Sequence, residues 1–163
     1  MIVVIGIGQT LRGDDAAGVR AVQFWQKNYP HTSLRSDVQV VIEELPGLAL
    51  LELLSGASAV VIADAVRSGA RPGEIYQLEL TDLAAFTPGS SSAHGWGLAE
   101  TLALGRILGI PDLPEMISLV GIEASELNAG ASLSPLVADS IERAADLIES
   151  LVTGWLTRES SGN

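Results

Sequence analysis

The chain has 163 residues and a formal net charge of -11, with nine basic residues against twenty acidic ones. Nucleic acids and anionic membrane surfaces are bound by clustered Lys and Arg, so this balance argues against both partners. The sequence contains no cysteine, which excludes disulfides, a thiol nucleophile and thiolate metal ligands of its own. We therefore expect a cytoplasmic protein that binds neither nucleic acid nor membrane.

The composition favours a single α/β domain. Hydrophobic residues make up 47% of the chain and aromatic residues only 4%, so the core must consist largely of Ala, Val, Leu and Ile. The opening MIVVIGIGQT lacks the basic region of a signal peptide, and no apolar stretch is long enough to span a bilayer. We expect one domain over residues 1–157, followed by a polar tail that frays over residues 158–163.

Apolar and alternating segments predict five strands, over residues 2–5, 38–42, 57–63, 74–80 and 117–122. The run ASAVVIA at 57–63 is the best candidate for the central strand, because strands buried on both faces are continuously apolar. The segment EIYQLEL at 74–80 alternates polar and apolar residues, which indicates a half-exposed strand nearer an edge.

Helical patterns separate these strands. The first predicted helix begins with Asp14 or Asp15 as its cap and ends at Tyr29, and the second opens at Pro46 and Gly47. The third covers residues 97–108, with inward Leu98, Leu102 and Leu108. The last follows Ser134 as cap, with Pro135 at its first position, and is expected to bury Val137, Ile141, Ala144, Ile148 and Leu151.

Alternating strands and helices predict a parallel or mostly parallel sheet with helices on both faces. Binding sites in such sheets lie outside the carboxyl ends of the strands. That rule selects residues 6–15, 43–47, 64–66 and 121–123, and the loop over residues 90–94 can reach the same edge.

The glycine-rich segment GIGQTLRGDDAAG, at residues 6–18, does not fit a phosphate loop. A Rossmann fingerprint needs a glycine where Leu11 stands, and a P-loop needs Lys and Ser or Thr where Asp14 and Asp15 stand. Two carboxylates at a helix start would repel a phosphate but suit a cation. This disfavours a nucleotide-binding protein. One aspartate is explained as a helix cap, and we assign the other a functional role.

Asp64 and His94 are further candidates at this edge. Asp64 ends the third strand in IADAV, where its charge must face the edge because unpartnered burial is costly; an ordinary turn residue is the alternative. His94 lies in SSSAHGWG between Gly95 and a serine-rich loop, and the alternative is a solvated histidine at a helix start. His31, the other histidine, is expected in a surface loop.

Asp15, Asp64 and His94 can converge on one edge from three different crossovers. Two carboxylates and one imidazole, with coordination positions left open, suit zinc or nickel. The sequence contains neither the His-Glu-x-x-His helix of a metalloprotease nor a Gly-x-Ser-x-Gly nucleophile elbow. The pattern therefore predicts a metal-binding edge of another kind.

At these residues the chain resembles the hydrogenase maturation proteases. The resemblance extends from residue 1 to about residue 152 and rests on GIGQTLRGDDAAG, IADAV, SSSAHGWGLAETLALGR and LVGIEASELNAGASLSP, in that order. It implies a three-layer α/β/α sandwich with a mostly parallel five-stranded sheet. It also implies that Asp15, Asp64 and His94 are the catalytic and metal-site positions.

The resemblance further implies an endopeptidase that removes the C-terminal extension of a nickel–iron hydrogenase large subunit after nickel insertion. The cut would follow a basic residue just beyond the C-terminal cysteine motif. The nickel-loaded precursor would then be the partner and would supply the nickel, and we expect the protein to act as a monomer. The alternative is a non-catalytic, nickel-dependent checkpoint or chaperone for the immature subunit.

More than one mechanism fits these residues. Nickel could act as a Lewis acid or activate a water, or a carboxylate could act as general base. Asp14 is a candidate for that base or simply the helix cap, and Glu123 is a possible supporting group behind the metal ligands. The chain departs from the family pattern at Gln9, where Asn is usual, and at residues 43–47, where many members carry Asp-Gly-Gly. The second departure bears on which hydrogenase is the partner.

Overall fold

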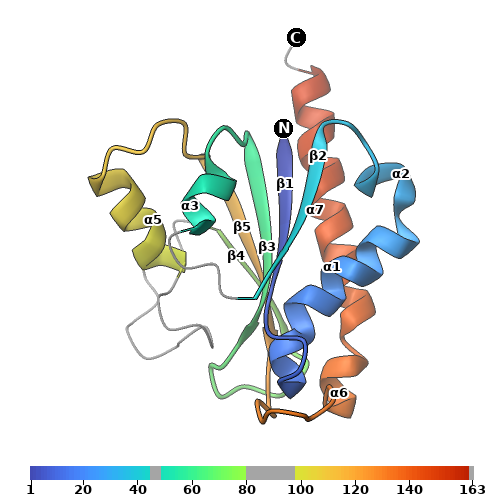
Figure 1. Ribbon diagram of the computed structural model, residues 1–163. Helices are drawn as coiled ribbons and strands as arrows, with labels where there is room; N and C mark the ends of the chain where they lie inside the picture. The colour runs from blue at the N-terminus through green and yellow to red at the C-terminus, as the bar shows by residue number, and fades with distance from the viewer. Residues whose placement is uncertain (45–48, 80–97, 162–163) are drawn as a thin grey trace.

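The computed structural model describes residues 1–44, 49–79 and 98–161. These residues fold into three layers, with a central sheet between two layers of helices (Figure 1). Helices α1 (Ala17–Asn28) and α7 (Ile141–Ser161) cover one face, and α3 (Ala49–Leu54) and α5 (Leu98–Ile107) cover the other. The predicted α/β/α sandwich is confirmed.

Within the described residues, five strands form one sheet in the order β2-β1-β3-β5-β4. The strands are β1 (Ile2–Ile7), β2 (Val38–Glu43), β3 (Ala59–Val66), β4 (Ile75–Glu79) and β5 (Met116–Glu123). All neighbours are parallel except β4, which runs antiparallel to β5 at one edge. The predicted central strand and the predicted edge strand are thus confirmed as β3 and β4.

Buried aliphatic side chains of β1 and β3 divide between two cores. Val4 of β1 and Val61 of β3 belong to the core that also contains α1 and α7. Val3 of β1 and Ile62 of β3 belong to the core that also contains α3. Because successive side chains of a strand point to opposite faces, a continuous apolar run is what a sheet covered on both faces requires.

The start of the first helix differs from the prediction. A short 3-10 helix, η1 (Gly13–Ala16), precedes α1, and neither aspartate forms a side-chain cap there. After α1 the chain forms another short helix, α2 (Pro30–Ser33), so His31 lies in a helical turn rather than in a loop. Asp14 and Asp15 therefore do not act as helix caps.

The third and last predicted helices also differ in detail. Helix α5 ends one residue earlier than predicted, at Ile107, and Leu108 is 62% exposed instead of facing inward. Pro46 and Gly47, expected to open the second helix, lie outside the described residues. The last helix is broken into α6 (Pro135–Ala138) and α7 at Ser140, which is fully buried.

Helix α7 buries most of the side chains expected of it. Ile141, Ala144 and Ile148 are buried, whereas Leu151 is only half-buried. The helix continues to Ser161, so most of the segment expected to fray is helical. No helix in the described stretches combines the length and apolar character needed to cross a bilayer.

Helix α1 begins in direct contact with the backbone of the sheet. A Cβ added at Gly18 would lie 2.2 Å from the carbonyl oxygen of Ala63 and 2.6 Å from that of Ile7. Real Cβ atoms essentially never approach this closely, so only glycine allows the helix to begin here. The contact places η1 over the carboxyl ends of β1 and β3.

We expect Gly18→Ala to lower the free energy of unfolding by about 1–3 kcal/mol, because the added methyl group must displace the helix from the two strands. Gly154 provides a matched control in α7, since a Cβ there meets nothing within 4 Å. Gly154→Ala should instead stabilise the protein by about 0.5–1 kcal/mol. Chemical denaturation of the two variants beside the parent measures both changes. Equal behaviour of the two alanines would contradict the close contact.

Candidate functional site

Four parallel strands end at the same edge of the sheet, the lower edge in Figure 1. We call it the carboxyl edge and define it by residues 8–16, 43–44, 64–69 and 121–134. Its loops come from distant parts of the sequence, and the predicted candidates Asp15 and Asp64 both lie on it. His94, the third predicted residue, lies outside the described residues.

Asp15 is held in η1, which packs against β3. Its side chain is 1% exposed, and its Oδ2 atom accepts a hydrogen bond of 3.1 Å from the backbone N–H of Gln9. The turn requires glycine at residue 8, where φ is +141° and an added Cβ would lie 1.8 Å from the carbonyl oxygen of Asp15. The end of β1 thus fixes the position of Asp15.

Asp64 lies inside β3, not at a turn after it. The strand continues to Val66, and Asp64 pairs with Gly121 of β5 while remaining only 5% exposed. Ala63 and Ala65 face the α1 side, so Asp64 faces the α3 and α5 side. Helix α5 begins at Leu98, four residues after His94 in the sequence.

Two buried carboxylates at one edge provide hard oxygen donors for a cation. Within residues 1–44, 49–79 and 98–161, no group of three or more His, Cys, Asp or Glu side chains is arranged to hold a metal ion. A complete site therefore requires a further donor besides Asp15 and Asp64.

Asp14 is neither a helix cap nor a group available for general base catalysis. It is fully buried, and its carboxylate accepts hydrogen bonds from the backbone N–H groups of Ser125 and Glu126, both at 2.9 Å. Ser134 donates two more, from its N–H at 2.6 Å and from its hydroxyl at 2.9 Å. Asp14 therefore fastens the loop between β5 and α6 to η1.

These contacts also determine the ionisation of Asp14. Burial alone would raise the pKa of the carboxyl group, but the hydrogen bonds from Glu126, Ser134 and Ser125 outweigh it and lower the pKa below its ordinary value. A buried carboxylate with a lowered pKa is a weak base. The structure thus removes Asp14 from the candidates for proton abstraction.

Glu123, the last residue of β5, is a second buried carboxylate that holds a loop by hydrogen bonds. Its side chain is 1% exposed and accepts hydrogen bonds from the Ser68 hydroxyl at 2.8 Å and from the backbone N–H groups of Ser68 and Gly69, both at 2.9 Å. The loop between β3 and β4 is therefore fastened to the end of β5. The sequence suggested that Glu123 supports the metal ligands from behind; the partners that the structure shows are Ser68 and Gly69, and the suggested role stays a prediction.

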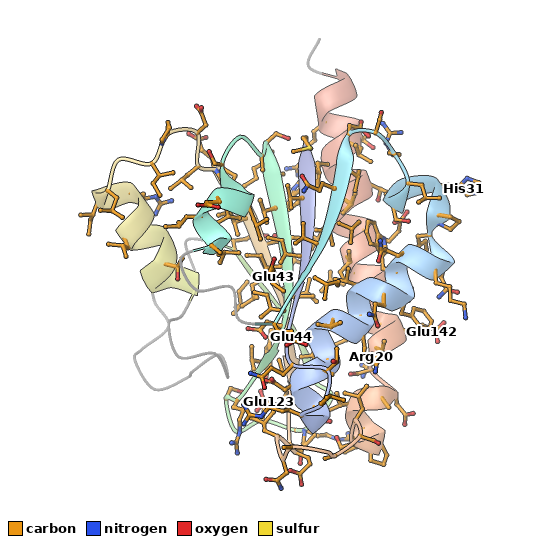
Figure 2. The ribbon with its side chains drawn as sticks, viewed as in Figure 1. Arg20, His31, Glu43, Glu44, Glu123 and Glu142 are labelled. Atoms are coloured by element: carbon orange, nitrogen blue, oxygen red, sulfur yellow. The ribbon has the colours of Figure 1, made fainter. Side chains whose placement is uncertain are left out.

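The two departures from the family pattern, at Gln9 and at residues 43–47, have different effects on the carboxyl edge. At Gln9 the backbone N–H, not the side chain, binds Asp15, so this contact does not depend on the side chain at that position. Glu43 is fixed beside it, because its carbonyl oxygen accepts a hydrogen bond of 3.0 Å from the Gly8 N–H. Glu43 is the last residue of β2 and Glu44 follows it; in Figure 2 both lie above Glu123. This segment adds acidic character to the carboxyl edge.

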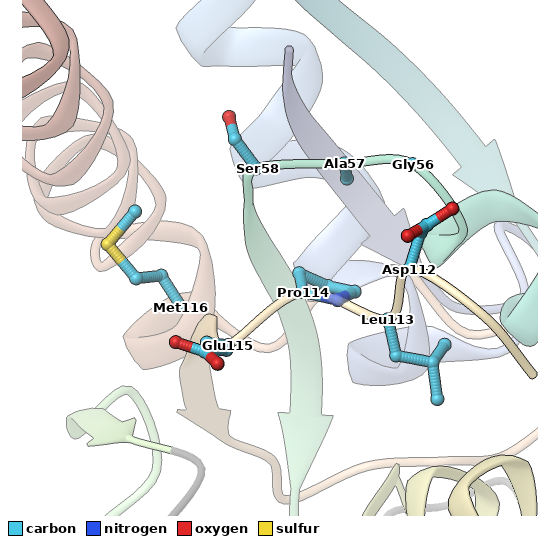
Figure 3. A pocket seen from close by; sticks show the side chains of 8 residues that line it. All are labelled: Gly56, Ala57, Ser58, Asp112, Leu113, Pro114, Glu115 and Met116. Atoms are coloured by element: carbon cyan, nitrogen blue, oxygen red, sulfur yellow. The ribbon is translucent and has the colours of Figure 1, made fainter. Parts of the chain in front are cut away.

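Other features lie away from this edge. His31 is exposed on α2, far from Glu123 in Figure 2. A pocket of about 530 Å³ is lined by residues 56–58 and 112–116, which precede β3 and β5 (Figure 3). It therefore lies at the opposite edge of the sheet, where the strands begin. Neither feature joins the two buried aspartates.

Comparison with known proteins assigns the family. The profile described as hydrogenase maturation protease matches residues 22–151. The chain belongs to the hydrogenase maturation protease family. It is 30% identical over 148 residues to the hydrogenase 2 maturation protease of Escherichia coli, a match that covers 90% of this chain and 87% of that protein.

Two further relatives support the assignment to the maturation proteases. The hydrogenase maturating endopeptidase HybD from E. coli superposes with a TM-score of 0.78 at 28% identity, covering 94% of this chain and 92% of that one. The hydrogenase expression/formation protein HupD of Thiocapsa roseopersicina is 34% identical over 90% of this chain. The match spans 65% of the length of that relative.

For this member of the family we expect Asp14→Ala to lower the free energy of unfolding by about 3 kcal/mol, because four hydrogen-bond donors lose a charged acceptor that is fully buried. Asp37 provides a control, since it is exposed and forms an ion pair with Arg35 at 2.7 Å. Asp37→Ala should cost less than about 1 kcal/mol. Urea denaturation at neutral pH measures both values. A small loss at Asp14 would show that its hydrogen bonds contribute little.

Proposed function

We propose that this protein is an endopeptidase that removes the C-terminal extension of a nickel–iron hydrogenase large subunit after nickel has been inserted. Its place of action under this proposal is the cytoplasm, and it acts as a monomer. The observation that carries the proposal is that Asp15 and Asp64 are both buried at the carboxyl edge of a chain that belongs to the hydrogenase maturation protease family.

We assign the contact with the substrate's nickel to Asp15, Asp64 and His94. The two carboxylates supply oxygen donors and the histidine supplies a nitrogen donor, a combination suited to a first-row divalent metal with positions left open. A chain without cysteine offers no thiolate to compete with those of the precursor. The nickel therefore stays with the substrate, and this protein adds ligands to it only in the complex.

This arrangement would make nickel a test of precursor maturity. An empty precursor cannot complete the shared coordination shell, so its scissile bond is not brought to the carboxyl edge. Asp15 is fixed by Gln9 before the substrate arrives, which reduces the ordering required on binding. Because Asp14 is committed to the loop over residues 125–134, we assign proton transfer to one of the three proposed ligand residues, Asp15, Asp64 or His94.

Removing a proposed ligand should abolish processing while the protein stays folded. We expect Asp64→Asn and His94→Ala to lower the cleavage rate roughly 100-fold or more, with a stability change of about 1 kcal/mol or less. The matched controls are Asp112→Asn, exposed at the opposite edge, and His31→Ala on α2. Mass spectrometry of the precursor after incubation measures cleavage. Full activity in a folded Asp64→Asn variant would refute the assigned site.

Cleavage should depend on nickel in the precursor, not on metal added to the protease. The test uses protein that has been stripped by a chelator and desalted, then mixed with nickel-loaded or nickel-free precursor. We expect release of the C-terminal peptide from the loaded form alone. Equal cleavage of the nickel-free form would contradict the test of maturity. Binding of the loaded form without any peptide release would favour the non-catalytic checkpoint instead.

A further inference from the structure

A hydrogen bond from Gln9 closes the loop that carries Asp15, and Asp14 anchors this loop to a neighbouring one. The Gln9 N–H bonds to the Asp15 carboxylate at 3.1 Å, so residues 9–15 form a loop with Asp15 at its base. Asp14, the preceding residue, directs its own carboxylate to the loop between β5 and α6 instead. Adjacent carboxylates in one turn therefore have separate partners.

Backbone contacts join the same two loops. The N–H of Asp14 donates to the carbonyl oxygen of Glu126 at 2.7 Å, and the N–H of Gly13 donates to that of Ala131 at 3.0 Å. In the other direction, the N–H of Gly130 donates to the carbonyl oxygen of Leu11 at 2.7 Å. These bonds join the same two segments that the buried Asp14 carboxylate connects.

From this arrangement we propose that Asp14 is a positioning residue, whose carboxylate holds η1 against the loop over residues 125–134 and thereby directs Asp15 to the carboxyl edge beside Asp64. Successive residues of a 3-10 helix are rotated by about 120° around its axis. Once the Asp14 side chain is anchored to the loop over residues 125–134, the direction in which the Asp15 side chain leaves η1 is determined. The part of this inference that concerns catalysis rests on the proposed function.

The amide of Gln9 reports the position of Asp15 directly, whatever reaction the protein performs. Asp14→Asn replaces one carboxylate oxygen with an NH2 group, which faces N–H donors and cannot accept their hydrogen bonds. We expect hydrogen exchange at the Gln9 amide to become at least tenfold faster relative to the Val61 amide in the centre of the sheet. Ser134→Ala removes only the hydroxyl donor and should give a smaller change in the same direction.

Glu123→Gln is the matched control for this measurement. Glu123 is as deeply buried as Asp14 and also binds backbone N–H groups, but those of Ser68 and Gly69. Its substitution should speed exchange at these two amides and leave the ratio of Gln9 to Val61 unchanged. An unchanged ratio in Asp14→Asn, or an equal rise in Glu123→Gln, would overturn the positioning role. If Asp14→Asn does not fold, Ser134→Ala decides the matter on the same ratio.

A second measurement separates positioning from simple destabilisation. With nickel-loaded precursor, Asp14→Asn should lower kcat at least tenfold with KM within twofold, at a temperature where the variant is fully folded. Glu149→Gln loses charged contacts to Trp25 and Thr32 on the α1 side and should leave kcat unchanged. A parent-like kcat in Asp14→Asn would overturn the positioning role. Failure of the parent to cleave any precursor would instead refute the proposed function, and the Gln9 ratio would still test the positioning.

Discussion

The arrangement of the carboxyl edge depends on how closely helix α1 approaches strands β1 and β3. The backbone of Gly18 lies against the carbonyl oxygens of Ile7 and Ala63, at a separation that no side chain would permit. This contact allows η1 to lie over β3 and allows the end of β1 to bind Asp15. A residue with no side chain thus sets the position of a carboxylate that would contact substrate.

The carboxylates of this edge fall into two groups with different partners. Asp14 and Glu123 are satisfied by backbone N–H and hydroxyl donors from neighbouring loops. An acidic protein with few basic residues can in this way hold buried negative charge without Lys or Arg. Asp15 and Asp64 lie at the same edge as these two loops, which the protein's own hydrogen bonds hold in place before any ligand binds.

The sequence predicted the layers, the sheet and the presence of Asp15 and Asp64 at the carboxyl edge, because these follow from local patterns, but it did not predict that both aspartates are buried. Continuous apolar runs identify β1 and β3, and the edge rule selects Asp15 and Asp64. The role of Asp14 could not be read in the same way, since its partners lie 111 to 120 residues away and are mainly backbone groups. The third strand was predicted to end at residue 63, but β3 continues to Val66. The charged Asp64 is the reason, because a charged residue after an apolar run is typical of a turn. His94 stays a prediction.

Four of the five strands that the structure describes run parallel, and only β4 is antiparallel to its neighbour; this mostly parallel pairing affects how the chain must fold. Strand β1 pairs with β3, β3 pairs with β5, and α7 packs on α1, so the main contacts between elements join segments that are distant in the sequence. Such topologies fold slowly, because long loops must close before their contacts form. During synthesis the carboxyl edge cannot assemble until residue 134 has left the ribosome. A nascent chain therefore has no working site until most of its length has been made.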